Sequence, residues 1–188
     1  ENIDVRGIVV QNGFFTPVKN RIIAESQQIV RVDHEKVTPL EEQLEQKLID
    51  SLPTLLEGVS VVAISDYGKG FLSTTLLAEI IDQAKSRDIP IISDPKGMDF
   101  AKYRGSTIIK PNLSEAYAAA NLPMEAPLDH VAAKVLNIAQ ADVLMVTRSE
   151  AGISIFHREG SREDYPVKVR EVKDVTGAGD TVLAMLAC

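Results

Sequence analysis

The sequence has only one cysteine, Cys188, and no tryptophan, and its three histidines are far apart. One cysteine excludes an internal disulfide framework, and no cysteines and histidines stand at the spacing of metal ligands. No apolar run reaches the length of a membrane span, and the N-terminus lacks a basic segment followed by an apolar one. The 27 acidic residues outnumber the 20 lysines and arginines, and the resulting net charge of −7 argues against a nucleic-acid surface. These absences favour a cytoplasmic protein that binds neither nucleic acid nor membrane, and 188 residues fit one domain of ordinary size.

The most informative segment that is present lies at residues 174–181, where Asp-Val-Thr-Gly-Ala-Gly-Asp-Thr continues into an apolar run typical of a helix. Small residues at the start of a helix leave the first backbone N–H groups open to an anion. We therefore expect the amides of Gly177, Ala178 and Gly179 to face an anion. Asp180 should lie in the first turn, where the helix dipole favours a carboxylate. This arrangement suits phosphoryl transfer, in which amides hold the charge of the moving group and a carboxylate accepts a hydroxyl proton. A turn capped by an acid, with no ligand, explains the four residues Gly-Ala-Gly-Asp equally well.

The flanking residues carry a family resemblance. Residues 174–181 resemble the C-terminal signature of the ribokinase-like (PfkB) carbohydrate kinases, in which the last aspartate, here Asp180, is the catalytic base. Further motifs resemble the subfamily of heptose 7-phosphate kinases of ADP-heptose biosynthesis in order and spacing, from about residue 19 to residue 188. These motifs are Ser-Asp-Tyr-Gly-Lys-Gly at 65–70, Asp-Pro-Lys-Gly-Met-Asp-Phe at 94–100, Lys-Pro-Asn-Leu-Ser-Glu at 110–115 and Val-Thr-Arg-Ser-Glu-Ala-Gly at 146–152.

The resemblance implies an ATP-dependent kinase that phosphorylates the anomeric hydroxyl of D-glycero-D-manno-heptose 7-phosphate, for lipopolysaccharide core precursor synthesis. It also implies a longer protein, because an N-terminal strand and a glycine-pair motif are expected before residue 1, and the chain ends inside the helix that begins at Gly177. Two alternatives stay open. One is a related kinase for another sugar or a nucleoside, and the other is an inactive fragment that serves as a folding or dimerisation unit.

The pattern of apolar residues predicts an α/β fold with a mostly parallel sheet and helices on both faces. Residues 1–35 alternate with β-branched positions, and Asn12–Gly13 marks a turn between residues 8–10 and the next run. The resemblance makes this segment a β lid that supports a homodimer, and it makes residues 36–188 a partial α/β core.

The core should begin with a helix from Thr38 to about Leu56, with a capping box at its start and a kink or break near Pro53. Predicted strands then lie at 59–64 (buried on both faces), 89–93, 107–109 and 142–147, with a hairpin at 152–157 and 165–169. Predicted helices lie at 73–87, 112–120 and 128–139.

Polar motifs follow the predicted strands, and ligands of such folds gather at the C-terminal ends of strands. Asn112 and Glu115 form a capping box on sequence grounds alone. The resemblance adds a role for this pair in binding Mg²⁺ and nucleotide phosphate through water, as Mg²⁺ prefers. It also implies that the end of the predicted strand 142–147 borders the nucleotide. The residues assigned to nucleotide contact are Thr147, Arg148, Ser149 and Gly152, together with Thr176, which shapes the signature loop.

Two lysines stand in glycine-containing loops after strands. Lys69 and Lys96 could therefore face one crevice and contact the sugar phosphate or the transferring group, and Asp94 could pair with one of them or support a metal. Solvation explains an exposed lysine as well. Lys19 and Arg21, with Arg31, lie on the predicted lid, where a phosphorylated acceptor would need cations and where exposed strands also carry them to discourage edge pairing.

Overall fold

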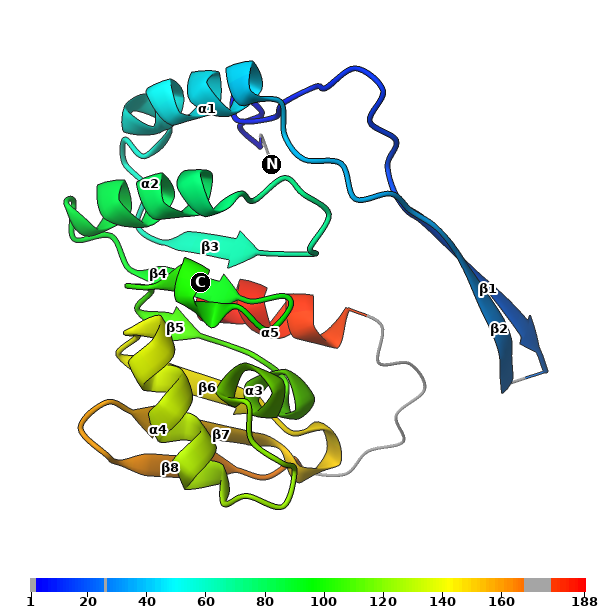
Figure 1. The fold of residues 1–188 in the computed structure, drawn as a ribbon, viewed down its shortest axis with the longest axis vertical. Coiled ribbons are helices and arrows are strands. Elements are labelled where there is room, and N and C mark those ends of the chain that lie inside the picture. The colour runs from blue at the N-terminus through cyan, green and yellow to red at the C-terminus, as the bar shows by residue number, and fades with distance from the viewer. Residues whose placement is uncertain (1–2, 26, 168–176) are drawn as a thin grey trace.

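The computed structural model describes residues 3–25, 27–167 and 177–188. Two sheets are present in these residues: a two-stranded sheet of β1 and β2, and a six-stranded sheet in the order β3-β4-β5-β6-β7-β8 (Figure 1). The strands are β1 Val18–Ala24, β2 Gln27–His34, β3 Val62–Ser65, β4 Ile91–Asp94, β5 Ile108–Ile109, β6 Val143–Thr147, β7 Ile153–His157 and β8 Arg162–Tyr165. The helices are α1 Glu42–Leu55, α2 Thr74–Lys85, α3 Leu113–Ala120, α4 Leu128–Ala139 and α5 Ala178–Leu186, with short 3₁₀ helices at Phe100–Tyr103 and Ser149–Ala151.

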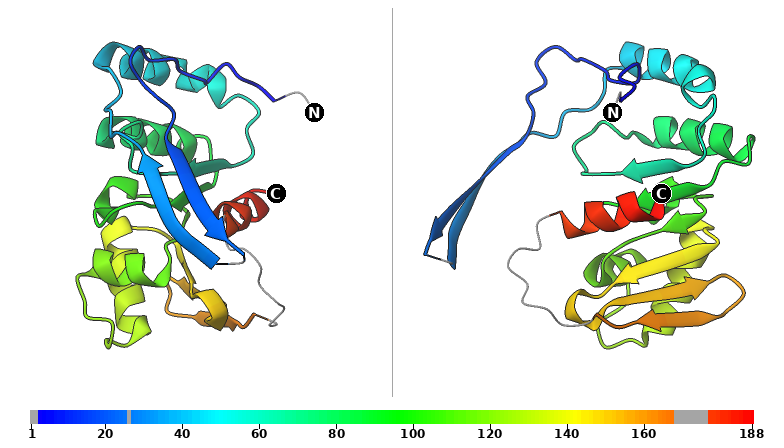
Figure 2. Two further views of the ribbon diagram at one scale, coloured as in Figure 1. Left: turned by 90° about the vertical axis from the view of Figure 1, so that its right-hand side faces the viewer. Right: turned by 180° about the vertical axis from the view of Figure 1, so that it is seen from behind.

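The larger sheet has a parallel part and an antiparallel part. Strands β3 to β6 are parallel, whereas β7 and β8 each run antiparallel to the preceding strand. Helices α2, α3 and α4 lie on one face of this sheet and α5 lies on the opposite face (Figures 1 and 2). The predicted fold class, a mostly parallel sheet between helices, is therefore confirmed.

The main core lies between the sheet and the layer formed by α2 and α4. Ile91, Ile109 and Leu144, one from each of β4, β5 and β6, are fully buried there. Each such side chain stabilises the fold by about 2 kcal/mol through removal of apolar surface from water. This rigid layer fixes the C-terminal ends of the parallel strands, where the loops of the candidate site begin.

Strand β3 differs from its predicted form. The run 59–64 suggested a strand buried on both faces, but in β3 only Ile64 is buried, and Ala63 and Ser65 are exposed. The reason is position, because in the part of the chain that the structure describes β3 is the edge strand of the six-stranded sheet and is paired with β4. The strand that is buried throughout its first three residues is β4.

Helix α1 begins later than predicted. Thr38 does not cap it; the first helical residue is Glu42, and the preceding Glu41 makes no side-chain capping bond. Residues 38–40 are instead held to the loop after β3, because the Thr38 amide donates to the Lys69 carbonyl (3.1 Å) and the Leu40 amide donates to the Gly70 carbonyl (3.1 Å). The helix continues through Pro53 and ends two residues later, so the predicted break falls at its C-terminal end.

The strands β1 and β2 form an antiparallel hairpin that projects away from the six-stranded sheet (Figures 1 and 2). The predicted strand at residues 8–10 does not form; Asn12 and Gly13 make a turn within the irregular segment before β1. The second predicted hairpin forms with a shifted second strand, since β8 ends at Tyr165, where the predicted strand begins. The later part of that predicted strand lies outside the described residues.

Candidate functional site

A cavity of about 290 Å³ opens at the C-terminal ends of the parallel strands, where the sheet rules place ligands. We call it the strand-end cavity. It contains seven of the predicted site residues, from four different segments of the chain. Its lining residues are Ser65, Asp66, Tyr67, Asp94, Pro95, Lys96, Lys110, Asn112, Glu115, Thr147, Gly179 and Asp180.

The first turn of α5 forms one wall of the strand-end cavity. Gly177 is the N-cap and has φ +77°, a conformation that favours glycine. The first helical hydrogen bond runs from the Thr181 amide to the Gly177 carbonyl (2.9 Å), so the amides of residues 178–180 precede any partner within the helix. Asp180 is exposed and lies in this turn. The arrangement expected from the sequence, open amides beside a carboxylate, is present in the described part of the signature; Thr176 lies outside the described residues.

Asp180 has a partner that the sequence did not reveal. The hydroxyl of Tyr67, in the loop after β3, donates a hydrogen bond of 2.8 Å to Oδ1 of Asp180. This bond to the carboxylate, together with partial burial, raises the pKa of the Tyr67 hydroxyl above its ordinary value. Tyr67 therefore stays a hydrogen-bond donor and fixes one oxygen of the acid.

The predicted capping box of α3 is confirmed. The Asn112 side chain accepts from the Glu115 amide (2.9 Å), and Oε2 of Glu115 accepts from the Asn112 amide (3.0 Å). The other carboxylate oxygen of Glu115 accepts from Nζ of Lys96 at 2.8 Å. The cap therefore coexists with a polar cluster that faces the cavity.

Asp94 forms an ion pair with Lys110, a residue given no role in the sequence interpretation. Nζ of Lys110 lies 2.9 Å from Oδ2 of Asp94, and the lysine side chain is only 3% exposed. Burial raises the pKa of the Asp94 carboxyl, and the contact with Lys110 opposes this rise. A lysine followed by proline and a helix cap gives no local signal of burial, so only the fold reveals this pair.

Asp66, which also lines the strand-end cavity, was given no role in the sequence interpretation. Its side chain is 5% exposed, and Oδ2 accepts from Lys102 Nζ and from the Tyr103 hydroxyl, both at 2.6 Å. Oδ1 accepts from the Gly68 amide at 2.7 Å. The Tyr103 hydroxyl in turn accepts from the Lys96 amide (3.0 Å). This network fixes the loops after β3 and β4 relative to each other.

A second cavity, of about 500 Å³, lies where the β1–β2 hairpin meets the core, and we call it the hairpin cavity. It shares Ser65, Asp66 and Tyr67 with the strand-end cavity. The remaining lining residues are Phe14, Pro17, Lys19, Lys69, Phe71 and Leu72.

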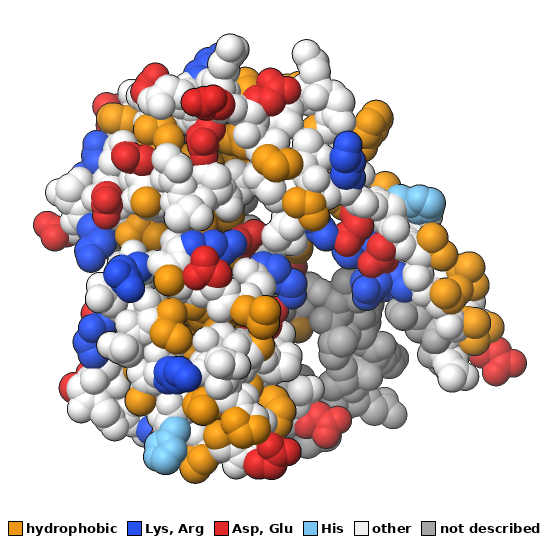
Figure 3. All heavy atoms as spheres, in the orientation of Figure 1, with side chains coloured by type: hydrophobic (Ala, Val, Ile, Leu, Met, Phe, Trp, Pro, Cys, Tyr) orange, Lys and Arg blue, Asp and Glu red, His pale blue; other side chains and the backbone are white. Residues whose placement is uncertain are grey.

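Charged side chains of both signs gather at this junction (Figure 3). Glu35 accepts from Lys69 (2.6 Å) and from Lys19 (3.1 Å), which also pairs with Asp33. Lys69 and Lys96 thus line different cavities, contrary to the expectation of one shared crevice. Arg21 lies on β1 opposite Arg31 and lines neither cavity.

The end of β6 is brought to the strand-end cavity only in part. Thr147 lines it, whereas Arg148, Ser149 and Gly152 do not. Arg148 donates to Asp164 (3.2 Å) and to the Ala151 carbonyl (3.1 Å). Gly152 has φ +87°, and a Cβ there would overlap the backbone of Tyr165, so the glycine is required by packing against β8.

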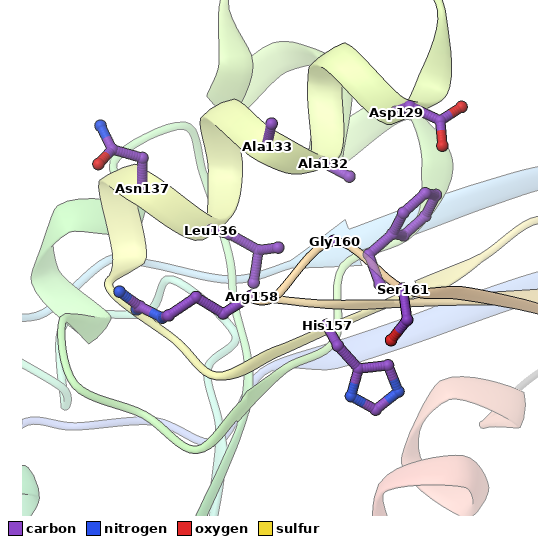
Figure 4. A pocket seen from close by; sticks show the side chains of 10 residues that line it. Asp129, Ala132, Ala133, Leu136, Asn137, His157, Arg158, Gly160 and Ser161 are labelled. Carbon is purple, nitrogen blue, oxygen red and sulfur yellow. The ribbon is translucent and has the colours of Figure 1, made fainter.

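A third cavity, of about 290 Å³, lies between α4 and the β7–β8 connection (Figure 4). It contains none of the predicted site residues. The guanidinium of Arg158, which lines this cavity, already donates two hydrogen bonds to the Ala141 carbonyl at 3.0 and 2.8 Å. This cavity is separate from the acids and lysines described above.

Two properties of the described residues bear on cofactors and on membranes. Among residues 3–25, 27–167 and 177–188, no three His, Cys, Asp or Glu side chains are placed together to hold a metal ion. In the same part of the chain, none of the helices combines the length and the apolar character that crossing a membrane requires.

Helices on both faces of a mostly parallel sheet, with a helix N-terminus and a carboxylate at the strand ends, define the ribokinase-like class of kinase folds. Solved structures have the same fold. Phosphofructokinase-2 from Escherichia coli in complex with substrates and products aligns with a TM-score of 0.68 and 20% identity, over 90% of this chain and 56% of that chain. Ribokinase from Giardia lamblia aligns with a TM-score of 0.67 and 20% identity, over 89% of this chain and 54% of that chain.

The chain belongs to the pfkB family of carbohydrate kinases, whose family model matches residues 1–187. Among curated proteins, the "Bifunctional protein HldE" of Trichlorobacter lovleyi is 45% identical over 190 residues, which cover 100% of this chain and 39% of the relative. The protein of the same name from Geobacter sulfurreducens is 44% identical over 188 residues, 99% of this chain and 38% of the relative. The chain thus spans about two fifths of the length of these relatives. The family predicted from the sequence is confirmed.

Proposed function

We propose that the protein transfers the γ-phosphoryl group of ATP to the anomeric hydroxyl of D-glycero-D-manno-heptose 7-phosphate and forms the 1,7-bisphosphate, a lipopolysaccharide core precursor. Membership in the pfkB family and the similarity to proteins named HldE support a sugar kinase of this kind. The observation that carries the chemistry is the position of Asp180, in the first turn of α5 and inside a cavity at the strand ends.

In the proposed reaction, Asp180 accepts the proton of the acceptor hydroxyl. The hydroxyl oxygen then bonds to the γ-phosphorus, the bond from this phosphorus to the β–γ bridging oxygen breaks, and ADP leaves. The open amides of the α5 turn, from Gly177 to Gly179, hold the negative charge on the moving group. The hydrogen bond from Tyr67 to Oδ1 leaves Oδ2 of Asp180 for the acceptor.

The nucleotide phosphates are proposed to lie near Asn112, Glu115 and Thr147, with the turn 148–152 beside them. Both oxygens of Glu115 already accept hydrogen bonds, and the described residues hold no ready group of three metal ligands. This donor set fits Mg²⁺ that keeps its own waters and is supported through them by Glu115 and Asn112. When bound, Mg²⁺ would neutralise charge on the transferring phosphates.

The acceptor is proposed to occupy the hairpin cavity, with Lys19 and Lys69 available to its 7-phosphate. In this proposal residues 1–35 are a lid over the acceptor and residues 36–188 are the catalytic core. The exposed apolar side chains of the hairpin support a homodimer formed through the lid (Figure 3); they are Val18, Ile22, Ile23, Ile29, Val30 and Val32. We place the activity in the cytoplasm, where ATP and sugar phosphates are present.

The test uses the full-length protein, ATP and a panel of acceptors. Heptose 7-phosphate should be turned over with a far higher kcat/KM than ribose, fructose or adenosine, and preference for one of these three would contradict the acceptor assignment. Asp180→Asn should keep nucleotide affinity and lose about 10²-fold or more of kcat. Near-normal turnover of this variant would remove Asp180 from the role of base.

A further inference from the structure

Glu35 lies at the junction between the β1–β2 hairpin and the core, directly after the last residue of β2. Its two carboxylate oxygens accept from two distant parts of the chain. Oε1 accepts from Nζ of Lys69, in the loop after β3 (2.6 Å), and Oε2 accepts from Nζ of Lys19, on β1 (3.1 Å). Hydrogen bonds from these two lysines hold the pKa of the Glu35 carboxyl below its ordinary value. One ionised carboxylate therefore joins the hairpin to the core and brings two ammonium groups together.

Both lysines line the hairpin cavity, whereas Glu35 is not among its lining residues. The carboxylate thus holds the two ammonium groups from outside the cavity and does not fill the space in front of them. An ammonium has three N–H donors. Among the described residues, Lys69 gives one to Glu35, and Lys19 gives one to Glu35 and one to Asp33. Donors on both lysines remain for an anion inside the cavity.

The other carboxylates close to this place have partners of their own. Asp66, which also lines the hairpin cavity, forms an ion pair with Lys102 at 2.6 Å. Asp33 pairs with Arg31 at 2.8 Å as well as with the lysine on β1. Asp180 lines the strand-end cavity and not the hairpin cavity. The hydrogen-bonding capacity left on this wall is therefore mainly that of the two ammonium groups.

The contact between Glu35 and Lys69 acts on position more than on stability. The two side chains are 27% and 24% exposed, and ion pairs that water can reach stabilise a fold little. Position is fixed twice, because the Thr38 amide also donates to the Lys69 carbonyl at 3.1 Å. The segment that follows β2 is thus bound to Lys69 through both a side chain and the backbone.

We propose that Glu35 is a positioning residue that holds Lys19 and Lys69 as one phosphate-binding pair and thereby makes the protein selective for a phosphorylated acceptor. This inference rests on the proposed function, which places the acceptor in the hairpin cavity. A phosphate group has several acceptor oxygens and binds both ammonium groups at once, whereas an unphosphorylated sugar has no group that needs the pair. Without the Glu35 carboxylate, the two like charges repel each other and separate across the junction.

The test measures initial rates of the full-length protein with heptose 7-phosphate and with the same heptose lacking the phosphate. Glu35→Gln should raise the KM for heptose 7-phosphate about tenfold, the loss expected for one charged hydrogen bond, and leave kcat nearly unchanged. The kcat/KM for unphosphorylated heptose and the melting temperature should stay close to wild type. Glu25→Gln, at an exposed position in the turn between β1 and β2, is the matched control and should change neither KM.

A double-mutant cycle tests whether Glu35 acts through the lysines. Added to Lys19→Met and Lys69→Met together, Glu35→Gln should have no further effect on the KM for heptose 7-phosphate. If Glu35→Gln alone does not fold, Glu35→Asp decides. It keeps the charge but is one methylene shorter and does not reach both lysines, so it should raise the same KM by a smaller factor.

An unchanged or lowered KM for heptose 7-phosphate in the deciding variant overturns the positioning role. An equal rise for both acceptors, or a further rise when both lysines are already replaced, overturns it as well. Each of these results leaves the kinase assignment intact. A wild-type protein that phosphorylates neither heptose overturns the proposed function and this inference together.

Discussion

The hydroxyl of Tyr67 lies 2.8 Å from Oδ1 of Asp180, although 113 residues separate the two in the chain. This contact joins the loop after β3 to the first turn of α5, and Tyr67 is also a wall residue of both the strand-end cavity and the hairpin cavity. The acid proposed to receive the acceptor proton is therefore held by a residue that borders the proposed acceptor site.

Tyr67→Phe should lower kcat about tenfold with little change in nucleotide affinity, because it removes the bond that orients the Asp180 carboxylate and keeps the ring. Thermal stability should stay close to wild type, since Tyr67 is 59% exposed. Steady-state kinetics and a melting curve check both points. Tyr165→Phe is the matched control, because Tyr165 also donates to a carboxylate, Glu163, but lines neither cavity. Equal turnover of the two variants would contradict the orienting role.

Lys19→Met and Lys69→Met should each raise the KM for a phosphorylated acceptor about tenfold or more and leave kcat nearly unchanged, since these side chains line the hairpin cavity away from the reacting atoms. Arg21→Met, on the same hairpin but outside the cavity, should change KM little. Initial rates over a range of acceptor concentrations measure this. A larger effect at Arg21 than at the lysines would place the acceptor phosphate elsewhere on the hairpin.

Asp66→Asn should destabilise the protein by about 2 kcal/mol at pH 7. Burial alone would raise the pKa of the Asp66 carboxyl, but hydrogen bonds from Lys102, Tyr103 and the Gly68 amide outweigh it and hold this pKa below 3.8. The folded state therefore binds fewer protons than the unfolded state as the pH falls through 3.8 and below, so the stabilisation by Asp66 is present above this range and is lost within it.

Urea unfolding of wild type and Asp66→Asn at pH 7 and near pH 3 checks this prediction. The difference in free energy of unfolding should narrow at the lower pH. Asp82→Asn, at an exposed position on α2, is the control and should track wild type at both pH values. A constant difference across the range would mean that the ionised carboxylate of Asp66 is not the source of stability.

Gly70→Ala should cost about 3 kcal/mol of stability. Gly70 has φ +97°, and a Cβ would lie 2.5 Å from the Thr38 carbonyl oxygen, so the segment that leads into α1 would have to move. Gly97→Ala separates strain from overlap, because Gly97 also has a positive φ (+87°) but no atom lies within 4 Å of its Cβ position. We expect about 1 kcal/mol for this control. Equal losses in denaturant unfolding would show that close packing at Gly70 is not the cause.

Local signals predicted the core helices well. The limits of α4 agree with the structure, and the Asn112–Glu115 capping box forms as expected, because both depend on residues within a few positions of each other. The predicted start of the first helix at Thr38 was wrong because it depends on contacts that are distant in the chain. The sequence around Thr38 fits a helix start, but the amide of this residue and that of Leu40 bond to the loop at residues 69–70, which lies far away in the chain. The exposure of β3 likewise depends on its place at the sheet edge and not on its composition.

The candidate site was predictable where a motif is contiguous. The signature turn with Asp180, and the pair Asn112 and Glu115, lie in the strand-end cavity as expected. Lys110 and Tyr67 were missed because their partners, Asp94 at the end of β4 and Asp180 in α5, lie in other segments of the chain, and a lysine or tyrosine in a loop carries no sign of its contact. Arg148 was assigned to nucleotide contact, but in the structure its guanidinium pairs with Asp164, and the nucleotide contact stays a prediction.

A single stretch, Ser65 to Tyr67, borders both cavities. If the acceptor binds as proposed, selectivity among sugars and the rate of catalysis both depend on this stretch and are not independent. A substitution in that stretch that admits a new acceptor also disturbs the support of Asp180, so variants selected for altered preference should begin as slow enzymes. Recovery of their speed would require second changes elsewhere, and the first turn of α5 is where such compensation should accumulate.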